Sequence, residues 1–115
     1  MRIKNIEIEF DFLDADNVEL FEKEAQKVVE KTQTERKEMT YSQALRMECD
    51  IVEEFLDNVF GKGLSKDLFN GKKNLKEHIE IFQYVVDEKN SKQSELQSIY
   101  NRYAPNREQR RKGRR

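Results

Sequence analysis

Hydrophobic and acidic residues alternate near the start of the chain, and this period of two predicts a half-buried β-strand. Its apolar positions are Ile6, Ile8, Phe10 and Phe12. No second run of this quality follows, and a lone strand leaves its backbone N–H and C=O groups without hydrogen-bond partners. The strand must therefore pair with a weaker local segment or with another molecule. We expect the pairing to be intermolecular, in a homo-oligomer or by strand addition to a partner.

Two segments with helical spacing of apolar residues follow the strand. Asp16 and Glu19 form a capping-box-like start for a first helix, which we expect to run to about Lys37. Thr40 and Gln43 form a second capping signature, for a second helix over roughly residues 41–60.

A third long helix is predicted to start at Asn74 and to end before Pro105, which lacks the backbone N–H that a helix needs. Its first apolar stripe stops at a polar stretch over residues 87–93. Apolar spacing then resumes in a second patch, which consists of Leu96, Ile99, Tyr100 and Tyr103. This patch either closes the helical bundle or forms a docking face for a client helix or another copy.

Residues 60–75 interrupt the helical pattern and hold three of the four glycines. Leu64, Leu68 and Phe69 predict a packed connection here rather than a loose linker. The glycines match no nucleotide-binding motif, because Lys66 stands where G-x-G-x-x-G needs its last glycine and Lys73 where a P-loop needs Ser or Thr. We therefore expect a mainly α fold, with about three helices in a small bundle and one N-terminal strand. The helical domain covers residues 1–104, and a basic tail covers residues 105–115.

The net charge of −1 hides a division along the chain. Residues 1–60 hold 8 basic and 16 acidic residues, whereas residues 107–115 hold 6 basic residues and one acidic residue. The basic tail could bind phosphates or an acidic protein surface. The folded part is acidic, and the tail has no aromatic residue for base stacking, so we expect a nucleic-acid partner less than a protein partner. The tail positions that we select as binding candidates are Arg107, Arg110 and Arg111.

Candidate chemistry is sparse. Cys49 is alone, which rules out a disulfide within the chain and suits a reducing cytosol. Cys49 with His78 could form a nucleophile, but we expect a packed thiol and a half-exposed imidazole, since no third orienting group is indicated. The pair cannot supply four zinc ligands. We expect no catalytic residues, no metal and no cofactor.

The acidic positions of the second helix are expected to form a solvated face, with Glu48, Glu53, Glu54 and Asp57. No apolar run is long enough to cross a membrane.

Several sequence features together resemble the tail assembly chaperones of long-tailed phages and prophages of Gram-positive bacteria. They lie mainly within residues 52–111. An acidic helix ends in Val59-Phe60-Gly61-Lys62-Gly63, and a connector ends in Leu68-Phe69-Asn70-Gly71-Lys72-Lys73-Asn74-Leu75. An amphipathic helix and the terminal run from Tyr103 to Arg111 follow.

This resemblance implies a non-enzymatic function in the cytoplasm of the bacterial host. Such chaperones bind the long tape measure protein and keep it soluble while the tail tube assembles, so the implied partners are the tape measure protein and the major tail protein. For strand-mediated contacts we select Ile6, Ile8, Phe10 and Phe12, and for helix-mediated contacts the second patch of the third helix. The alternative is a small phage DNA-associated or regulatory protein that uses its basic tail.

Overall fold

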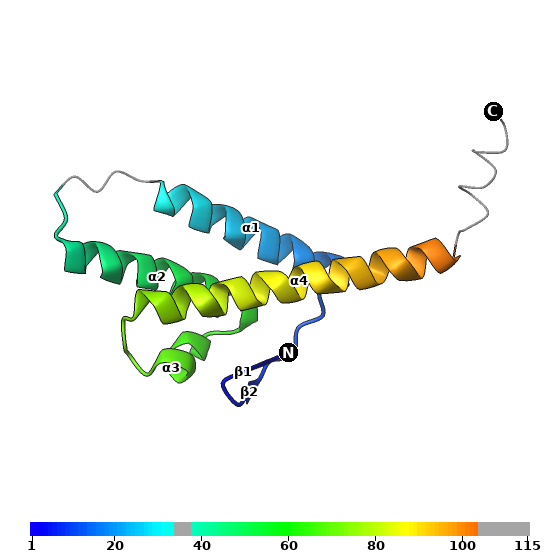
Figure 1. Ribbon diagram of the computed structural model, residues 1–115, viewed down its shortest axis with the longest axis horizontal. Helices are drawn as coiled ribbons and strands as arrows, with labels where there is room; N and C mark the ends of the chain where they lie inside the picture. Colours follow the sequence, from blue (N-terminus) through cyan, green and yellow to red (C-terminus); the bar gives the residue numbers. More distant parts are fainter. Residues whose placement is uncertain (34–37, 104–115) are drawn as a thin grey trace.

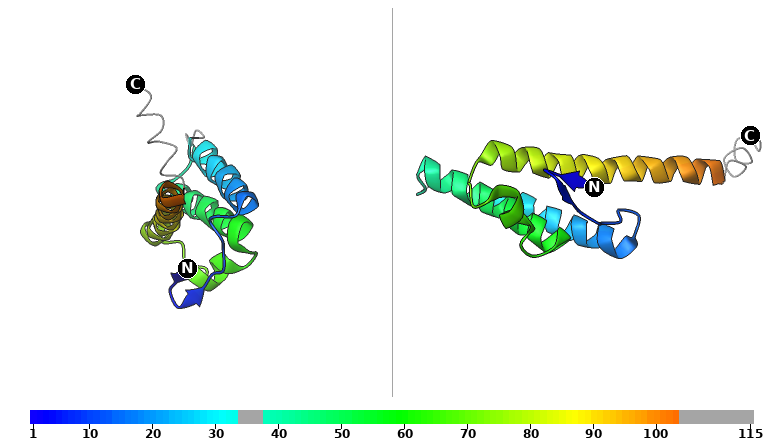
Figure 2. Two further views of the ribbon diagram at one scale, coloured as in Figure 1. Left: turned by 90° about the vertical axis from the view of Figure 1, so that its right-hand side faces the viewer. Right: turned by 90° about the horizontal axis from the view of Figure 1, so that it is seen from below.

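The computed structural model describes residues 1–33 and 38–103. Within these ranges the chain forms a short hairpin and four helices, in the order β1 (Arg2–Ile3), β2 (Ile6–Glu7), α1 (Ala15–Thr32), α2 (Tyr41–Phe60), α3 (Leu64–Phe69) and α4 (Leu75–Tyr103). The helix α2 packs against both α1 and α4, while α3 and the hairpin lie on one flank of this elongated bundle (Figures 1 and 2). The expectation of a mainly helical fold is confirmed.

The start of α2 follows the sequence prediction. The Thr40 side chain accepts a hydrogen bond from Gln43 N, and the Gln43 side chain accepts one from Thr40 N, which completes the capping box. The start of α1 differs from the sequence prediction. Asp14 caps this helix, because its side chain accepts hydrogen bonds from the backbone N–H groups of Asp16 and Asn17. The predicted cap at Asp16 was therefore wrong by two positions. The helix α1 ends at Thr32, and residues 34–37 lie outside the described residues.

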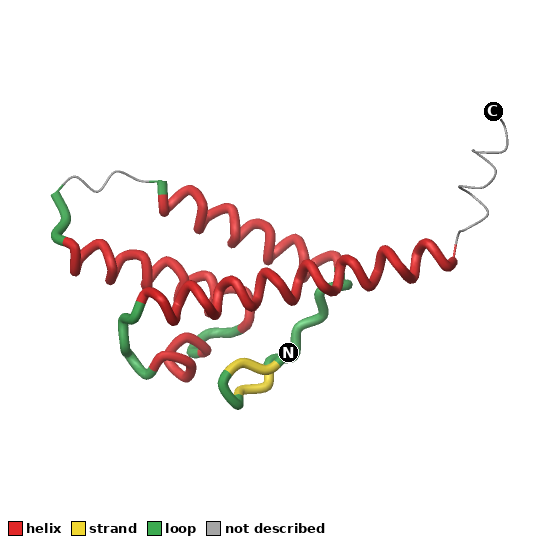
Figure 3. The backbone as a smooth tube through the Cα atoms, in the orientation of Figure 1, coloured by secondary structure: helices red, strands yellow, loops and turns green. Residues whose placement is uncertain are grey.

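The expected N-terminal strand is much shorter than its sequence pattern, and its pairing is within the chain. Ile6 pairs with Ile3 and Glu7 with Arg2 in an antiparallel hairpin, which Figure 3 shows in yellow. The expectation of an intermolecular strand was wrong here, because the sequence around β1 does not alternate and its strand character was missed.

The hairpin turn consists of Lys4 and Asn5, whose φ angles of 48° and 69° are both positive, as a type I′ turn requires. The Lys4 side chain then fixes the hairpin to the helices. Its Nζ donates to the carbonyl of Leu68 at 2.8 Å and forms an ion pair with Glu77.

Residues 8–11 have no regular secondary structure and residues 12–13 form a turn, and this segment carries its apolar side chains into the helical core. Ile8 and Phe12 are buried, and Phe10 packs edge-to-face against Phe12 and Phe60, with ring centroids 4.9 and 4.8 Å away. Burial among helices therefore replaces strand pairing as the reason for the alternating pattern. The core also contains Phe21, Val52, Phe55, Leu56, Val59, Leu68, Phe69, Ile81 and Val85.

The glycine-rich connector is packed, as predicted, and it contains a helix that the sequence did not reveal. Gly61 and Gly63 adopt φ angles of 133° and 95°, which residues with a side chain rarely adopt. Asp57 accepts hydrogen bonds from the backbone N–H and the hydroxyl of Ser65, both at 2.8 Å, and so ties the first turn of α3 to α2. Leu68 and Phe69 are buried beneath the bundle.

Candidate protein-binding surface

The helix α4 is longer than the body against which it packs. Its 29 residues span about 43 Å, whereas the 20 residues of α2 span about 30 Å. The second half of α4 therefore projects beyond the other helices (Figure 1, yellow to orange). We refer to residues 89–103 as the distal segment of α4.

Apolar residues on α4 follow a heptad repeat, and the same face changes from buried to exposed along the helix. His78 and Val85 are buried in the body. Lys89 and Lys92 occupy the next two heptad positions of this face. Lys89 Nζ lies 5.7 Å from the centroid of the Phe21 ring, where the aliphatic stem of the lysine covers the edge of the core, whereas Lys92 is exposed. Beyond Lys92 the apolar positions return on the projecting part of the helix.

Four large apolar side chains in the distal segment remain substantially exposed, and we name them the distal stripe. Leu96 is 46% exposed, Ile99 42%, Tyr100 49% and Tyr103 88%. Their spacing of three and four residues places them on one face of the helix. The structure thus brings together the residues that the sequence selected for helix-mediated contacts. Their binding function stays a prediction.

The distal stripe has polar flanks, which keep the projecting helix compatible with water. Lys92 and Glu95 form an ion pair at 3.3 Å, and Gln97 donates to Asn101 at 3.1 Å. Arg102 is exposed on the last turn.

The residues selected for strand-mediated contacts do not form a comparable surface. Ile8 and Phe12 are buried, while Ile6 and Phe10 are half-buried and pack against the core. These side chains are used inside the molecule, and their function in binding another molecule stays a prediction. The other selected positions, Arg107, Arg110 and Arg111, lie outside the described residues.

The structure also contains an open groove between α2 and α4, which we did not predict from the sequence. Tyr41 and Leu45 contribute one wall, and Leu75 and Ile79 contribute the other. Tyr41 and Ile79 are exposed although both carry large apolar groups. Each residue follows the helical spacing of its own element, so only the packing of α2 on α4 revealed that they share a groove.

His78 is fully buried, which corrects the expectation of a half-exposed imidazole. Its Nδ1 lies 2.6 Å from the carbonyl oxygen of Asn74, and its Nε2 lies 2.8 Å from Glu53 Oε2. The ring stacks on Phe69 with a centroid separation of 3.6 Å and an interplanar angle of 8°. Both ring nitrogens are therefore engaged, and the histidine joins α2, α3 and α4 as a structural residue.

The acidic face expected on α2 is partly used for structure. Glu53 accepts from Lys73 Nζ at 2.7 Å as well as contacting His78, and Asp50 accepts from the same lysine at 2.8 Å. Hydrogen bonds to Asp50 and Glu53 raise the pKa of Lys73. Glu53 and Asp57 are therefore not simply solvated, which corrects the sequence prediction.

Cys49 is packed, as predicted, and its environment does not activate it. Burial raises the pKa of the thiol, and the nearby carboxylate of Glu53 acts in the same direction. A raised pKa disfavours the thiolate, which is the nucleophilic form.

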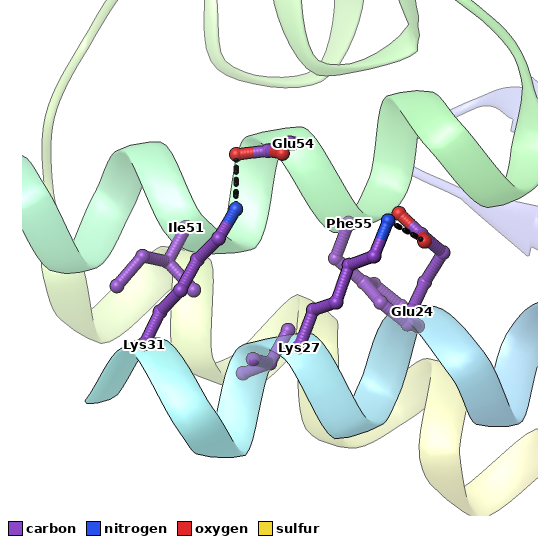
Figure 4. Close-up of a pocket in the computed structure, with 7 residues that line it drawn as sticks. Glu24, Lys27, Lys31, Ile51, Glu54 and Phe55 are labelled. Atoms are coloured by element: carbon purple, nitrogen blue, oxygen red, sulfur yellow. Dashed lines mark hydrogen bonds and ion pairs between the residues drawn. The ribbon is translucent and has the colours of Figure 1, made fainter. Parts of the chain in front are cut away.

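The hollow between α1 and α2 is too small for a ligand (Figure 4). Its volume is about 10 Å³, which is about the space that one water molecule needs. Lys31 pairs with Glu54 across the two helices at 2.7 Å, and Lys27 pairs with Glu24 at 2.8 Å (Figure 4).

In residues 1–33 and 38–103 no three His, Cys, Asp or Glu side chains cluster as metal ligands would. None of the described helices is long and apolar enough to cross a membrane.

Comparison with protein families matches residues 4–114 to a family of unknown function, DUF6673. The chain belongs to DUF6673. Searches of curated proteins and of solved structures give no significant match. The match begins after β1 and covers β2 and the four described helices of this DUF6673 protein, so the family includes the distal segment of α4 as well as the body.

Proposed function

We propose that this DUF6673 protein is a phage tail assembly chaperone, which binds the tape measure protein and keeps it soluble during assembly of the tail tube. The observation that supports this function best is the distal stripe, where four large apolar side chains stand exposed on a projecting helix. The sequence resemblance to tail assembly chaperones provides the identity of the client.

The distal stripe has the geometry of a helix-binding surface. Its residues occupy positions i, i+3, i+4 and i+7, which are the anchor positions when one amphipathic helix packs against another. A tape measure protein is long and helical, so it offers apolar faces of matching period. Polar flanks around an exposed apolar stripe suit a protein that must itself remain soluble while it holds a client.

The same proposal assigns the protein to the cytoplasm of the bacterial host, as a homo-oligomer with the tape measure protein and the major tail protein as partners. It assigns no catalytic function. The polar network around His78 is consistent with this, since its groups bond to one another and hold helices together.

Co-expression with the tape measure protein tests the function. The test variant is Leu96→Ser/Tyr100→Ser, and the control variant is Asn90→Ala/Asn101→Ala, which changes polar positions on another face of the same segment. We expect the wild type and the control to keep the tape measure protein in the soluble fraction, and the test variant to lose this activity with unchanged far-UV circular dichroism. A test variant that still solubilises the client, or a wild type that never does, overturns the proposal.

A second candidate function is DNA association through the basic tail, which the 6 basic residues within residues 107–115 favour. Measuring DNA binding against salt concentration separates it from the first. A tail that contacts phosphates gives binding that falls steeply with salt. Absence of binding at physiological salt removes this second function.

A further inference from the structure

We propose that the distal segments of α4 from two copies of this protein pair antiparallel, so that each distal stripe covers the other. This inference concerns the protein without a client, and it stands whether or not the proposed chaperone function is correct. It rests on the heptad register of α4 and on the charges that flank the distal stripe.

The register places apolar residues of the two copies in the same layers. Leu96 and Ile99 occupy the first and fourth positions of a heptad, which form the seam of a two-helix coiled coil. In an antiparallel pair the first position of one helix packs against the fourth position of the other. Leu96 therefore packs against Ile99 of the second copy, and the reciprocal contact follows from the two-fold symmetry.

The next layer outward joins Lys92 to Tyr103 of the second copy. The aliphatic stem of a lysine can lie along an aromatic ring while its ammonium group reaches water. Tyr103, which is the most exposed member of the distal stripe, becomes covered in this way. The pairing ends at this layer, where the body of each copy begins, so the two bodies lie at opposite ends of the helix pair.

The flanking charges are complementary in this orientation. Glu95 and Arg102 occupy equivalent positions on one side of the seam, one heptad apart. In the antiparallel pair Glu95 faces Arg102 of the second copy, and Arg102 faces Glu95 of the second copy, which gives two ion pairs. The ion pair of Glu95 with Lys92 within one helix is exposed, and such pairs contribute little, so it does not prevent the new contact.

A parallel pair is much less favourable. It would place Lys89 beside Lys89 and Lys92 beside Lys92 of the second copy, in two consecutive layers of like charge. Glu95 would then face Tyr100 rather than a basic residue. The charges of the distal segment thus select the antiparallel orientation.

The size of the interface indicates a weak dimer. The exposed parts of the four stripe residues amount to about 500 Å² per copy, or about 1,000 Å² in total, which is at the lower limit for specific interfaces. We therefore expect association in the micromolar range or weaker, which leaves the distal stripe accessible to competing helices.

Sedimentation equilibrium over a wide concentration range, with charge-exchange variants, tests the proposal. Each of Glu95→Arg and Arg102→Glu replaces two attractive contacts by two repulsive ones, so each should weaken dimerisation about tenfold. The double exchange Glu95→Arg/Arg102→Glu restores both ion pairs and should return the dissociation constant to within about threefold of the wild type. Glu95→Gln is the control for loss of the Lys92 contact and should have a smaller effect than Glu95→Arg.

Three results would overturn the antiparallel dimer. They are a wild type that stays monomeric at the highest concentration, an Arg102→Glu variant that dimerises as well as the wild type, and a double exchange that shows no recovery. Circular dichroism at low concentration verifies that each variant is folded. A protein that dimerises as expected but fails to solubilise the tape measure protein would retain this inference and lose the proposed function.

Discussion

Replacement of His78 by alanine should destabilise the protein strongly, because this side chain joins three helices. The ring is buried, stacks on Phe69, and places its two nitrogens against the carbonyl of Asn74 and the carboxylate of Glu53. His78→Ala removes a ring from a packed site, for which large-to-small aromatic substitutions cost about 3–5 kcal/mol. Asn74 O also accepts from the backbone N–H of residue 78, and Glu53 keeps Lys73, so few groups are left unbonded. We therefore expect His78→Ala to lower the free energy of unfolding by about 3 kcal/mol, at the lower end of that range.

The variant His78→Phe separates packing from hydrogen bonding. Phenylalanine retains the ring and its stacking on Phe69 but can bond to neither oxygen. Loss of these hydrogen bonds should cost about 1–2 kcal/mol. The difference between the two variants then gives the packing contribution. Glu80→Ala, at an exposed position of the same helix, is the control, and its free energy of unfolding should lie within about 0.5 kcal/mol of the wild-type value.

Urea unfolding followed by circular dichroism measures these differences, at protein concentrations low enough to keep the chain monomeric. A loss of 3 kcal/mol lowers the midpoint by about 2 M urea if the slope is about 1.5 kcal/mol/M. If the free energy of unfolding of His78→Ala lies within about 0.5 kcal/mol of the wild-type value, the ring does not join the helices as described.

Three further predictions use the same measurement. Phe12→Ala should cost about 3–5 kcal/mol, because the ring is buried in the core, and a surface-like loss below 1 kcal/mol would contradict that placement. Thr40→Ala removes the capping box of α2 and should cost about 1 kcal/mol, whereas an unchanged midpoint would argue against the cap. The hydrogen bond from Lys27 lowers the pKa of Glu24 below its ordinary 4.5, so this carboxylate stabilises the fold above that pH, and the stability is lost as pH falls through the lowered pKa. Wild type should therefore lose more stability than Glu24→Gln between pH 6 and pH 3, and parallel pH profiles would contradict the pKa shift.

Local signals in the sequence determined most of the helical framework. The capping box at Thr40 and the glycine at position 61 fixed the bounds of α2, because both act through the backbone of their immediate neighbours. The spacing of Leu96, Ile99, Tyr100 and Tyr103 fixed their common face for the same reason, since helix geometry alone decides it. The heptad register of the distal segment is likewise a property of the sequence.

Tertiary structure decided what each of these faces contacts. The alternation from Ile6 to Phe12 is compatible with a strand or with an irregular segment that packs on helices, and only the position of the helical core favoured the second. The burial of His78 depended on Phe69 and Glu53, which come from two other helices and carry no local signal. Similarly, the sequence showed that the distal stripe is apolar, but the lengths of α2 and α4 and their packing left it exposed. Local hydrogen bonding sets where a helix begins and ends, whereas burial depends on residues that are distant in the chain.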